Sequence, residues 1–301
     1  MQSKWRVAPA VAAARLSAAI LLSAAVAWSG TAGAQTTAAP KQDYAPAVGQ
    51  EGKDVIWVPT PQSLVERMLQ MADTKATDYV VDLGAGDGRT VITAAKKFGA
   101  RALGIEYNPD MVELAKRSAE KEGVTGKAQF MKADIFETDF SQATVLTLYL
   151  LPSLNLKLRP TILNMKPGTR VVSHAFTMDD WQADQTDSSE GRTAYMWIVP
   201  AKVQGAWRLE VAGSGPRTYE GSFEQKFQNL EGAFKADNKA ALLLRNGKLK
   251  GETISFTLND PDAKTRRDFV GRVDGNRIAG VAKVAGTNAE SKWTATRTGT
   301  Q

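Results

Sequence analysis

The residues best suited to chemistry lie in one glycine-rich turn, Asp82-Leu83-Gly84-Ala85-Gly86-Asp87-Gly88. An apolar run precedes the turn and an amphipathic pattern follows it, which predicts a buried strand, a turn and the start of a helix. Glycines let the backbone approach a ligand closely, and the first N–H groups of a helix are free to bind a carboxylate. The turn therefore predicts a site for a nucleotide-like ligand. Its candidate binding residues are Asp82, Gly84, Gly86 and Gly88.

The spacing of these glycines differs from that of two familiar phosphate-binding loops. A dinucleotide fingerprint, G-x-G-x-x-G, needs a third glycine at position 89, where this chain has Arg89. No Gly-Lys-Ser/Thr follows, which excludes a P-loop. We expect Asp87 and Arg89 either to orient the turn or to form an ordinary local ion pair.

Two further acids follow predicted strands. Glu106 ends a strand 20 residues after Gly86, and Asp134 comes directly after the next strand. The carboxyl ends of parallel strands are where such sheets bind ligands, and an acid in the position of Glu106 can accept both hydroxyls of a ribose. Asp134 can accept the amino group of an adenine. The alternatives are a solvated strand end for Glu106 and a turn cap for Asp134.

Short apolar segments that alternate with amphipathic ones must position these residues. The predicted strands are 79–83, 102–106, 128–133, 145–150, 170–176 and 193–199, and the predicted helices are 90–98, 109–122 and 153–165. A helix before them is predicted to have Thr60 as its cap and Pro61 as its first residue, and Asn108 is predicted to cap the helix that begins at Pro109. This order predicts an α/β fold, a Rossmann-like sheet with helices on both faces.

The pattern changes near Pro200. From about residue 202, eight short segments alternate between apolar and polar residues, and turn signals such as Asn246-Gly247 separate them. This predicts a second, antiparallel β-domain, in which eight strands can close into a small barrel and so protect their edges.

The segment from Val58 to about Trp181 resembles the class I S-adenosylmethionine-dependent methyltransferases. "VVDLGAGDGR" is similar to their first motif, "GIEYNPD" carries the acid after the second strand, and "FMKADIF" is similar to the adenine-side motif. With "VPTP…VERML", "LYLLPSLNLKLRP" and "PGTRVVSHAF…W", these motifs are similar to one subgroup. It contains bacterial relatives of the mitochondrial protein-lysine N-methyltransferases that act on the ADP/ATP carrier and on an ATP synthase subunit. The resemblance implies S-adenosyl-L-methionine as cofactor and a protein lysine as methyl acceptor.

Tyr149 is the candidate catalytic residue, because methyltransferases of this class present substrate-facing residues after strand four. The alternative for Tyr149 is a packing role. His174 lies in an apolar run and is predicted to be a core histidine with its hydrogen bonds satisfied. Two other functions stay open: an exported protein that binds an S-adenosyl ligand or a partner without catalysis, and a small-molecule methyltransferase.

The composition excludes several classes of site. The chain has no cysteine and one histidine, so disulfides, thiolate catalysis and clusters of cysteine or histidine ligands are not expected, and no metal site is predicted. Residues 201–301 carry 17 basic and 11 acidic side chains. This excess predicts either a solvated barrel surface or a docking surface for an acidic protein or a membrane. No nucleic-acid partner is predicted.

The first residues have the layout of a secretory signal peptide. Lys4 and Arg6 precede an apolar run at 16–28, and Ala32-Gly33-Ala34 offers an A-x-A cleavage site. The run is shorter than the roughly 20 residues that span a bilayer. Because the first 42 residues contain no acid, a mitochondrial presequence is the alternative to periplasmic export. The predicted organisation is a signal peptide (1–34), a flexible tether (35–53), the methyltransferase domain (54–200) and the antiparallel β-domain (201–301).

Export with cleavage predicts a mature N-terminus at or near Gln35, because the A-x-A site ends at Ala34. Mass spectrometry of the protein purified from its native source measures this directly. An intact Met1 in a cytoplasmic fraction would refute the leader, and a mature end inside a mitochondrial fraction would favour the alternative.

Overall fold

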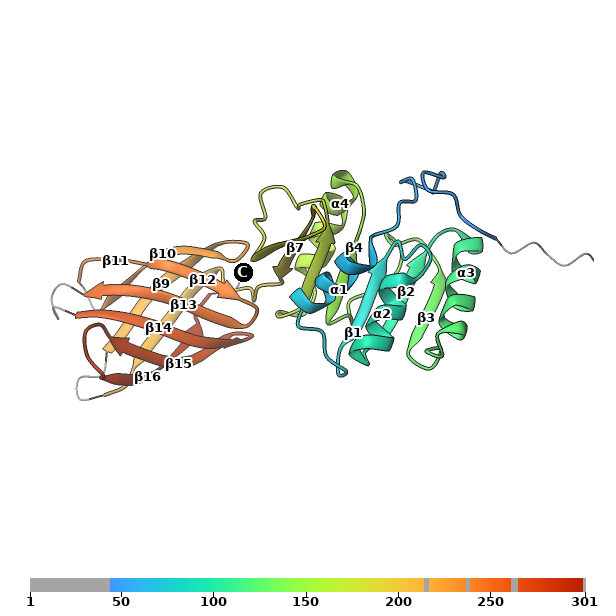
Figure 1. Ribbon diagram of the computed structural model, residues 1–301. Coiled ribbons are helices and arrows are strands. Elements are labelled where there is room, and N and C mark those ends of the chain that lie inside the picture. The colour runs from blue at the N-terminus through green and yellow to red at the C-terminus, as the bar shows by residue number, and fades with distance from the viewer. Residues whose placement is uncertain (1–43, 214–216, 237–238, 261–264, 300–301) are drawn as a thin grey trace, which may run out of the picture. The chain divides into compact units, whose positions relative to one another are not determined.

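The computed structural model describes residues 44–213, 217–236, 239–260 and 265–299, which contain two β-sheets (Figure 1). One sheet has seven strands and carries the helices, and the other has nine strands. The last strand of the first sheet ends at Ile198, and the first strand of the second begins at Gly205. The predicted signal peptide (1–34) and the start of the predicted tether (35–43) lie outside the described residues.

The seven-stranded sheet has the order β3-β2-β1-β4-β5-β7-β6. Its strands are β1 (Tyr79–Leu83), β2 (Arg101–Glu106), β3 (Ala128–Lys132), β4 (Val145–Leu148), β5 (Arg170–His174), β6 (Gln185–Ser189) and β7 (Arg192–Ile198). Its helices are α1 (Gln62–Met71), α2 (Arg89–Phe98), α3 (Pro109–Lys121) and α4 (Pro152–Leu163). The first five strands pair in parallel, as the alternating pattern predicts.

Chain order reverses beside β1, because β2 and β3 lie on one side of it and β4 and β5 on the other. The carboxyl ends of β1 and β4 therefore border the crevice where open α/β sheets bind ligands. At the far edge β7 pairs antiparallel with β5 and with β6. Strand β6 was not predicted, because its residues QTDSS are polar and show no apolar alternation.

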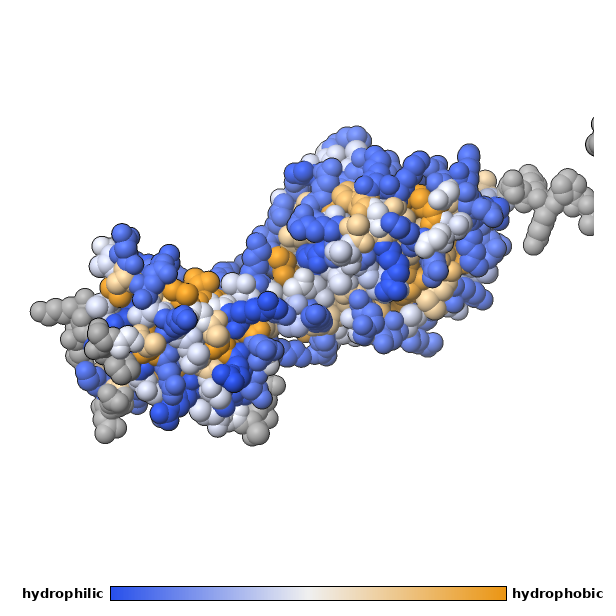
Figure 2. Space-filling view, turned by 90° about the horizontal axis from the view of Figure 1, so that it is seen from below, coloured by the Kyte–Doolittle hydropathy of each residue, from blue (hydrophilic) through white to orange (hydrophobic). Residues whose placement is uncertain are grey.

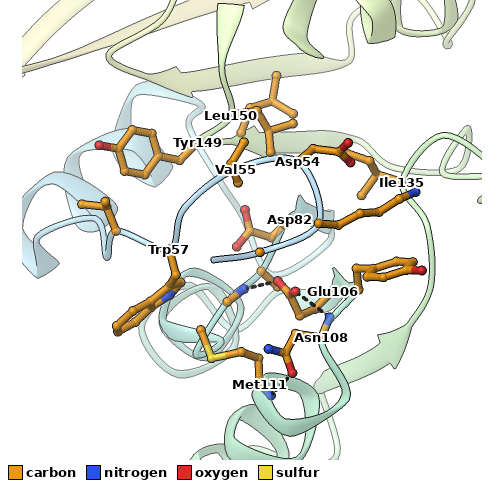
Figure 3. Close-up of a pocket in the computed structure, with 18 of the residues that line it drawn as sticks. Asp54, Val55, Trp57, Asp82, Glu106, Asn108, Met111, Ile135, Tyr149 and Leu150 are labelled. Atoms are coloured by element: carbon orange, nitrogen blue, oxygen red, sulfur yellow. Dashed lines mark hydrogen bonds between the residues drawn. The ribbon is translucent and has the colours of Figure 1, made fainter. Parts of the chain in front are cut away.

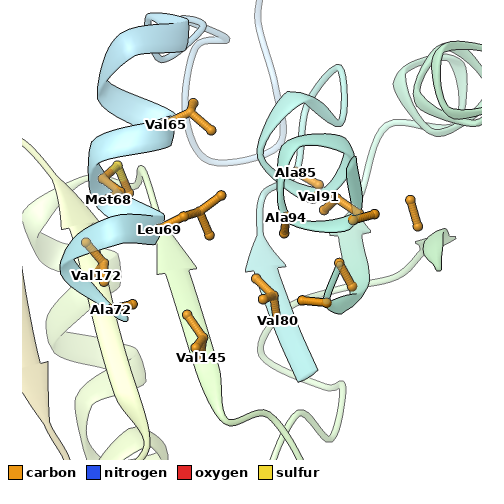
Figure 4. Close-up of a cluster of buried hydrophobic side chains, with 14 of the residues drawn as sticks. Val65, Met68, Leu69, Ala72, Val80, Ala85, Val91, Ala94, Val145 and Val172 are labelled. Atoms are coloured by element: carbon orange, nitrogen blue, oxygen red, sulfur yellow. The ribbon is translucent and has the colours of Figure 1, made fainter. Parts of the chain in front are cut away.

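Successive side chains of β1 pack on opposite faces of the sheet. Val80 belongs to a core that contains apolar residues of α1, α2 and α3, and Val81 belongs to a second core with Leu158 and Ile162 of α4. Figure 4 shows the first core, with Val65 and the other apolar residues of α1 beside the strands. Helices on both faces explain why the parallel strands read as continuous apolar runs.

The two predicted helix caps had different outcomes. Asn108 is confirmed as the cap of α3, because its side-chain oxygen accepts hydrogen bonds from the N–H groups of Asp110 (2.9 Å) and Met111 (3.4 Å). The prediction that Thr60 caps α1 is wrong. The helix begins at Gln62 with Pro61 as its cap, and the Thr60 hydroxyl instead pairs with His174.

The nine-stranded sheet closes into an antiparallel barrel, because β10 pairs with β9 as well as with β12. Eight strands form the ring, and the two-residue β11 pairs with β10. The strands are β8 (Gly205–Val211), β9 (Arg217–Lys226), β10 (Asn229–Ala236), β11 (Leu242–Leu243), β12 (Arg245–Lys250), β13 (Thr253–Asp260), β14 (Thr265–Asp274), β15 (Arg277–Val284) and β16 (Glu290–Arg297).

Aromatic side chains fill the barrel. Phe256 stacks on Phe269 with ring centroids 4.7 Å apart, and Trp293 meets both rings edge-on. The prediction of a hairpin turn at Asn246-Gly247 is wrong, since both residues lie within β12 where its register with β13 shifts. Asn246 has left-handed backbone, with a φ of 52°, and such a residue can occur in a bulge as well as in a tight turn.

The barrel surface carries paired charges. Ion pairs join Arg266 to Asp268 and Lys283 to Glu290, so part of the basic excess is balanced by nearby acids. On the face in Figure 2, hydrophilic residues dominate and hydrophobic residues form small patches. Among the residues that the structure describes, none of the helices has the length and apolar character needed to cross a membrane.

The turn between β9 and β10 contacts the helix-bearing part of the chain. Phe227 stacks on Trp181 with ring centroids 5.8 Å apart, and the Gln228 side chain donates a 2.8 Å hydrogen bond to the Gln182 carbonyl. Phe227 has a φ of 53°, where a two-residue hairpin loop favours Asn or Gly. Tertiary packing rather than local preference therefore explains an aromatic residue at this position.

Truncation after Ala201 tests how far the two parts depend on each other. We expect the shortened chain to bind S-adenosylhomocysteine within a few-fold of full length, because all predicted cofactor-binding residues precede residue 135. We expect a lower melting temperature, because the Phe227–Trp181 pair contributes about 0.5–1.5 kcal/mol. Full-length Phe227→Ala is the matched control and should reproduce part of that loss. A truncated chain that is unfolded, or that no longer binds, would show that the two parts share one core.

Candidate cofactor and substrate site

A cavity of about 630 Å³ lies at the carboxyl edge of the parallel strands. Figure 3 shows residues of three origins around it: the turn after β1, the segments after β2 to β4, and the chain that precedes α1. Of the predicted site residues, six line this cavity: Asp82, Gly84, Gly86, Glu106, Asp134 and Tyr149. The structure thus brings together residues that are up to 67 positions apart in the sequence.

All three glycines of the turn have left-handed backbone, with φ values of 79° at Gly84, 54° at Gly86 and 82° at Gly88. A side chain at Gly86 would meet the Trp57 indole, 2.7 Å from its nitrogen. Gly88 does not line the cavity, and a side chain there would collide with Phe130. The binding role of Gly88 stays a prediction, and the clash shows that a side chain there would disturb the packing of the turn.

The Glu106 carboxylate is held by backbone on both sides. One oxygen accepts a 2.9 Å hydrogen bond from the Gly86 N–H, and the other accepts a 2.9 Å bond from the Asn108 N–H (Figure 3). An ionised carboxylate has about four acceptor sites, so about two stay available to a ligand. Glu106 can therefore fix the turn and also accept the two hydroxyls of a ribose.

Asp82 is buried at the end of β1, and its carboxylate accepts a 2.6 Å hydrogen bond from the Thr147 hydroxyl. Burial raises the pKa of Asp82 to about 7, and the nearby charges of Glu106 and Asp87 act in the same direction. Three acids thus surround the turn. A ligand with positive charge would favour their ionised forms.

Asp134 follows β3 and forms an ion pair with Lys53, a residue of the segment before α1. One carboxylate oxygen accepts a 2.9 Å bond from the Phe136 N–H, and the other forms an ion pair with Lys53. The hydrogen bond from Lys53 is the main reason why the pKa of Asp134 lies below its usual value. Lys53 also lies over the Tyr107 ring, 4.8 Å from its centroid. The predicted adenine acceptor is therefore paired with a side chain that sequence reasoning did not connect with it.

The segment 50–60 is the part of the cavity wall that sequence reasoning missed. Its first residues belong to the predicted tether (35–53), and its last three fall in the "VPTP" motif, to which the sequence assigns no role in the site. Within it, Trp57 lies against the glycine turn, and its N–H and carbonyl groups pair with Gln50 and Gly49. A short aromatic and proline-containing stretch directly before the first helix was the available signal.

Tyr149 follows β4 and lines the cavity, and Figure 3 shows it on the opposite side from Ile135, the residue after Asp134. The centroid of its ring is 3.8 Å from that of the tilted His174 ring and 6.2 Å from that of Phe176. His174 is buried, and burial lowers its pKa to about 4, with a further contribution from Arg192. The prediction of a fully satisfied core histidine is only half right, because Nε2 has no hydrogen-bond partner among the residues that the structure describes.

Both interpretations of Asp87 and Arg89 hold. They form a local ion pair through two guanidinium nitrogens, with contacts of 2.6–3.1 Å. The third nitrogen, Nη1, donates a 2.8 Å bond to the carbonyl oxygen of Thr60. The pair therefore ties the glycine turn to the segment 50–60. Across the described ranges, no group of three or more His, Cys, Asp or Glu side chains is placed to hold a metal ion.

Comparison with known proteins assigns this part of the chain. Residues 82–185 match the family described as the ANTKMT methyltransferase domain. A protein-lysine N-methyltransferase of Saccharolobus islandicus is 43% identical over 151 residues, which are 48% of this chain and 94% of that protein. This chain belongs to the same methyltransferase family as that protein. The cofactor of the methyltransferase is S-adenosyl-L-methionine.

Two further similarities concern the same half of the methyltransferase chain. The adenine nucleotide translocase lysine N-methyltransferase of Mus musculus is 32% identical over 139 residues, 46% of this chain and 55% of that protein. A solved structure from Salinibacter ruber, described as an RNA methyltransferase in complex with S-adenosyl-L-homocysteine, is 51% identical. It covers 48% of this chain and 96% of that one, with a TM-score of 0.48.

The residues of the methyltransferase cavity fit S-adenosyl-L-methionine. Free acceptor sites on Glu106 suit the ribose hydroxyls, and the backbone at Gly84 and Gly86 leaves room for the amino-acid end at the start of α2. The acids around the turn suit a cofactor that carries a sulfonium and an ammonium group. Asp134 suits the adenine amino group once Lys53 gives up one contact.

Glu106→Ala should weaken S-adenosylhomocysteine binding at least tenfold, because each hydrogen bond to a charged group contributes about 1.5–3 kcal/mol. Because Glu106 also holds the Gly86 N–H, a 2′-deoxy analogue separates the two roles by calorimetry. The analogue should bind wild type more weakly than the parent compound and should lose nothing further against Glu106→Ala. Equal affinity of wild type for the two compounds would contradict the ribose role.

Gly86→Val should abolish cofactor binding while the fold survives, because left-handed backbone and the approach of Trp57 leave no space for a side chain. The pair Gly86→Ala and Gly86→Ala/Trp57→Ala identifies the cause. If the added methyl group acts only through Trp57, the double variant should regain the affinity of Trp57→Ala alone. If it displaces the ligand, affinity should stay lost. Calorimetry with circular dichroism as the folding control measures both, and an unchanged affinity of Gly86→Val would contradict the assignment.

Proposed function

We propose that this methyltransferase transfers the methyl group of S-adenosylmethionine to the side-chain amine of a lysine in a protein. The observation that carries the proposal is a single cavity that joins the cofactor residues Gly86 and Glu106 to an aromatic wall at Tyr149 and Phe176. The names of relatives as lysine N-methyltransferases support the same acceptor. They favour a protein-lysine methyltransferase over the two alternatives, a non-catalytic binding protein and a small-molecule methyltransferase.

The cofactor supplies an activated methyl group, so the protein must supply alignment and exclusion of water. A lysine amine attacks only when neutral, and at its ordinary pKa of ~10.4 about one in a few thousand is neutral at pH 7. The wall formed by Tyr149, Leu150 and Phe176 removes water from the amine, and desolvation favours the neutral form. No acid–base residue is required for this step.

We assign Tyr149 the role of a wall that directs the amine toward the methyl group. Its ring is fixed by contact with His174, which stays neutral because burial keeps its pKa near 4. On the opposite side, Glu106 and the glycine backbone fix the cofactor. The two reactants are then held by separate strand ends of one sheet, which limits their relative motion.

Export to the periplasm and docking of the β-barrel on an acidic protein or a membrane stay predictions from the sequence. The first depends on residues outside the described part of the chain. The second is supported by the basic excess of residues 201–301 and weakened by the ion pairs on the barrel.

The test is transfer of a labelled methyl group from S-adenosylmethionine into an extract of the protein's native source. We expect the label in protein, and methyl-lysine after acid hydrolysis. RNA from the same source and the small-molecule fraction are the control acceptors, and label in either of them rather than in lysine would contradict the proposal.

Tyr149 variants test the proposed wall. Tyr149→Ala should reduce transfer about tenfold to a hundredfold, because a small misplacement of a reactant costs rates of that order. S-adenosylhomocysteine affinity should stay within a few-fold of wild type. Tyr149→Phe keeps the ring and should retain most of the activity. A large loss in Tyr149→Phe would show that the hydroxyl takes part, and full activity of Tyr149→Ala would refute the assignment.

A further inference from the structure

The only histidine of the chain lies directly beside Tyr149. Leu148 of β4 pairs in parallel with Ser173 of β5, so the next residues, Tyr149 and His174, lie side by side at the strand ends. Neighbouring strands are about 4.8 Å apart, which lets two rings in register meet. The observed ring separation is 3.8 Å with an interplanar angle of 31°.

His174 does not line the cavity, whereas Tyr149 does. The imidazole is 1% exposed and lies behind the tyrosine ring as seen from the ligand space. Any effect of His174 on the reaction must therefore pass through a neighbour. The ring contact with Tyr149 is the available route.

Thr60 fixes the orientation of the imidazole. Its hydroxyl is 3.1 Å from His174 Nδ1, and its carbonyl oxygen accepts the 2.8 Å bond from Arg89. Arg89 is in turn held by Asp87 of the glycine turn. The cap position of α1 is occupied by Pro61, whose side chain has no hydrogen-bonding group, and the Thr60 hydroxyl bonds a residue 114 positions away.

We propose that Thr60 and His174 are positioning residues that hold the Tyr149 ring at the amine end of the cavity and so set the alignment of the methyl acceptor. The proposal rests on the proposed lysine methylation. Neither residue needs to exchange a proton in this role. A ring at the end of a strand keeps rotational freedom unless packing removes it, and methyl transfer is sensitive to small misplacements.

The chain offers well-matched variants. Thr60→Val keeps the shape and removes the hydroxyl, and Thr60→Ser restores the hydroxyl. His174→Phe keeps an aromatic ring against Tyr149 and removes the hydrogen bond. Thr74 is the control, because it is as buried as Thr60 and its hydroxyl has no hydrogen-bond partner within the described ranges. Thr74→Val makes the same chemical change away from the cavity.

The first measurement does not need a substrate. In tag-free protein, imidazole nitrogen NMR reports His174 alone, because the chain has one histidine. We expect one neutral tautomer that does not titrate between pH 6 and 8, and cross-relaxation between the His174 and Tyr149 rings. Thr60→Val should shift the Nδ1 resonance and weaken the cross-relaxation, while Thr60→Ser and Thr74→Val should not. An unchanged Nδ1 resonance in Thr60→Val would overturn the proposal.

The second measurement is methyl transfer from labelled S-adenosylmethionine into the native protein extract. We expect Thr60→Val and His174→Phe each to lower turnover about threefold to tenfold, with S-adenosylhomocysteine affinity within twofold of wild type. Thr60→Ser and Thr74→Val should stay near wild type. Thr60→Val should have no further effect in the His174→Phe background, because contacts in one chain of interactions are not additive.

The outcomes separate this proposal from the proposed function. Wild-type turnover in Thr60→Val, or additive losses in the double variant, would overturn the positioning role while lysine methylation stands. Label that appears in no lysine would overturn the proposed function, and the NMR measurement would still decide whether Thr60 orients His174 against Tyr149.

Discussion

The site depends on the hydrogen bonds that the Glu106 carboxylate accepts from the Gly86 and Asn108 N–H groups, each 2.9 Å long. Glu106 ends β2, Gly86 belongs to the turn after β1, and Asn108 begins α3, so one side chain joins three elements. The left-handed glycines of the turn have no side chains that could hold its backbone in place. The carboxylate supplies that constraint and keeps acceptor sites directed at the cavity.

Charge around this carboxylate explains why the site suits a cationic ligand. Asp82, Asp87 and Glu106 lie close enough for the pKa of Asp82 to be raised by the other two as well as by burial. Because the pKa of Asp82 is raised in the folded protein, the stability that Asp82 contributes falls as pH rises from about 4 to 7. Arg89 balances one acid directly. The positive charges of S-adenosylmethionine would balance the other two acids, so binding of the cofactor would also stabilise the folded protein.

The sequence predicted those parts of the site that depend on local pattern. The apolar strands end where an acidic residue stands, and this pattern placed Glu106 and Asp134 at the edge of the sheet. Both residues line the cavity. It could not show that Gly88 packs on Phe130, or that the hydroxyl of Thr60 bonds His174. Those contacts join elements far apart in the chain. When a residue suits a local role such as capping a helix, the sequence does not show that it will bond a distant residue instead.

The segment before α1 shows how much of a site can lie outside the motifs that carry the glycines and the cofactor acids. Lys53 reaches the adenine end at Asp134, Trp57 lies against Gly86, and Thr60 reaches the wall at Tyr149 through His174. An extended chain covers at most about 3.3–3.6 Å per residue, so the seven steps from Lys53 to Thr60 can span roughly 23–25 Å. Thr60 is fixed by two buried or half-buried hydrogen bonds, whereas solvent screens the exposed ion pair at Lys53. The Lys53 end is therefore the one that can yield when adenine takes its place on Asp134, and the end that supports the substrate wall stays fixed.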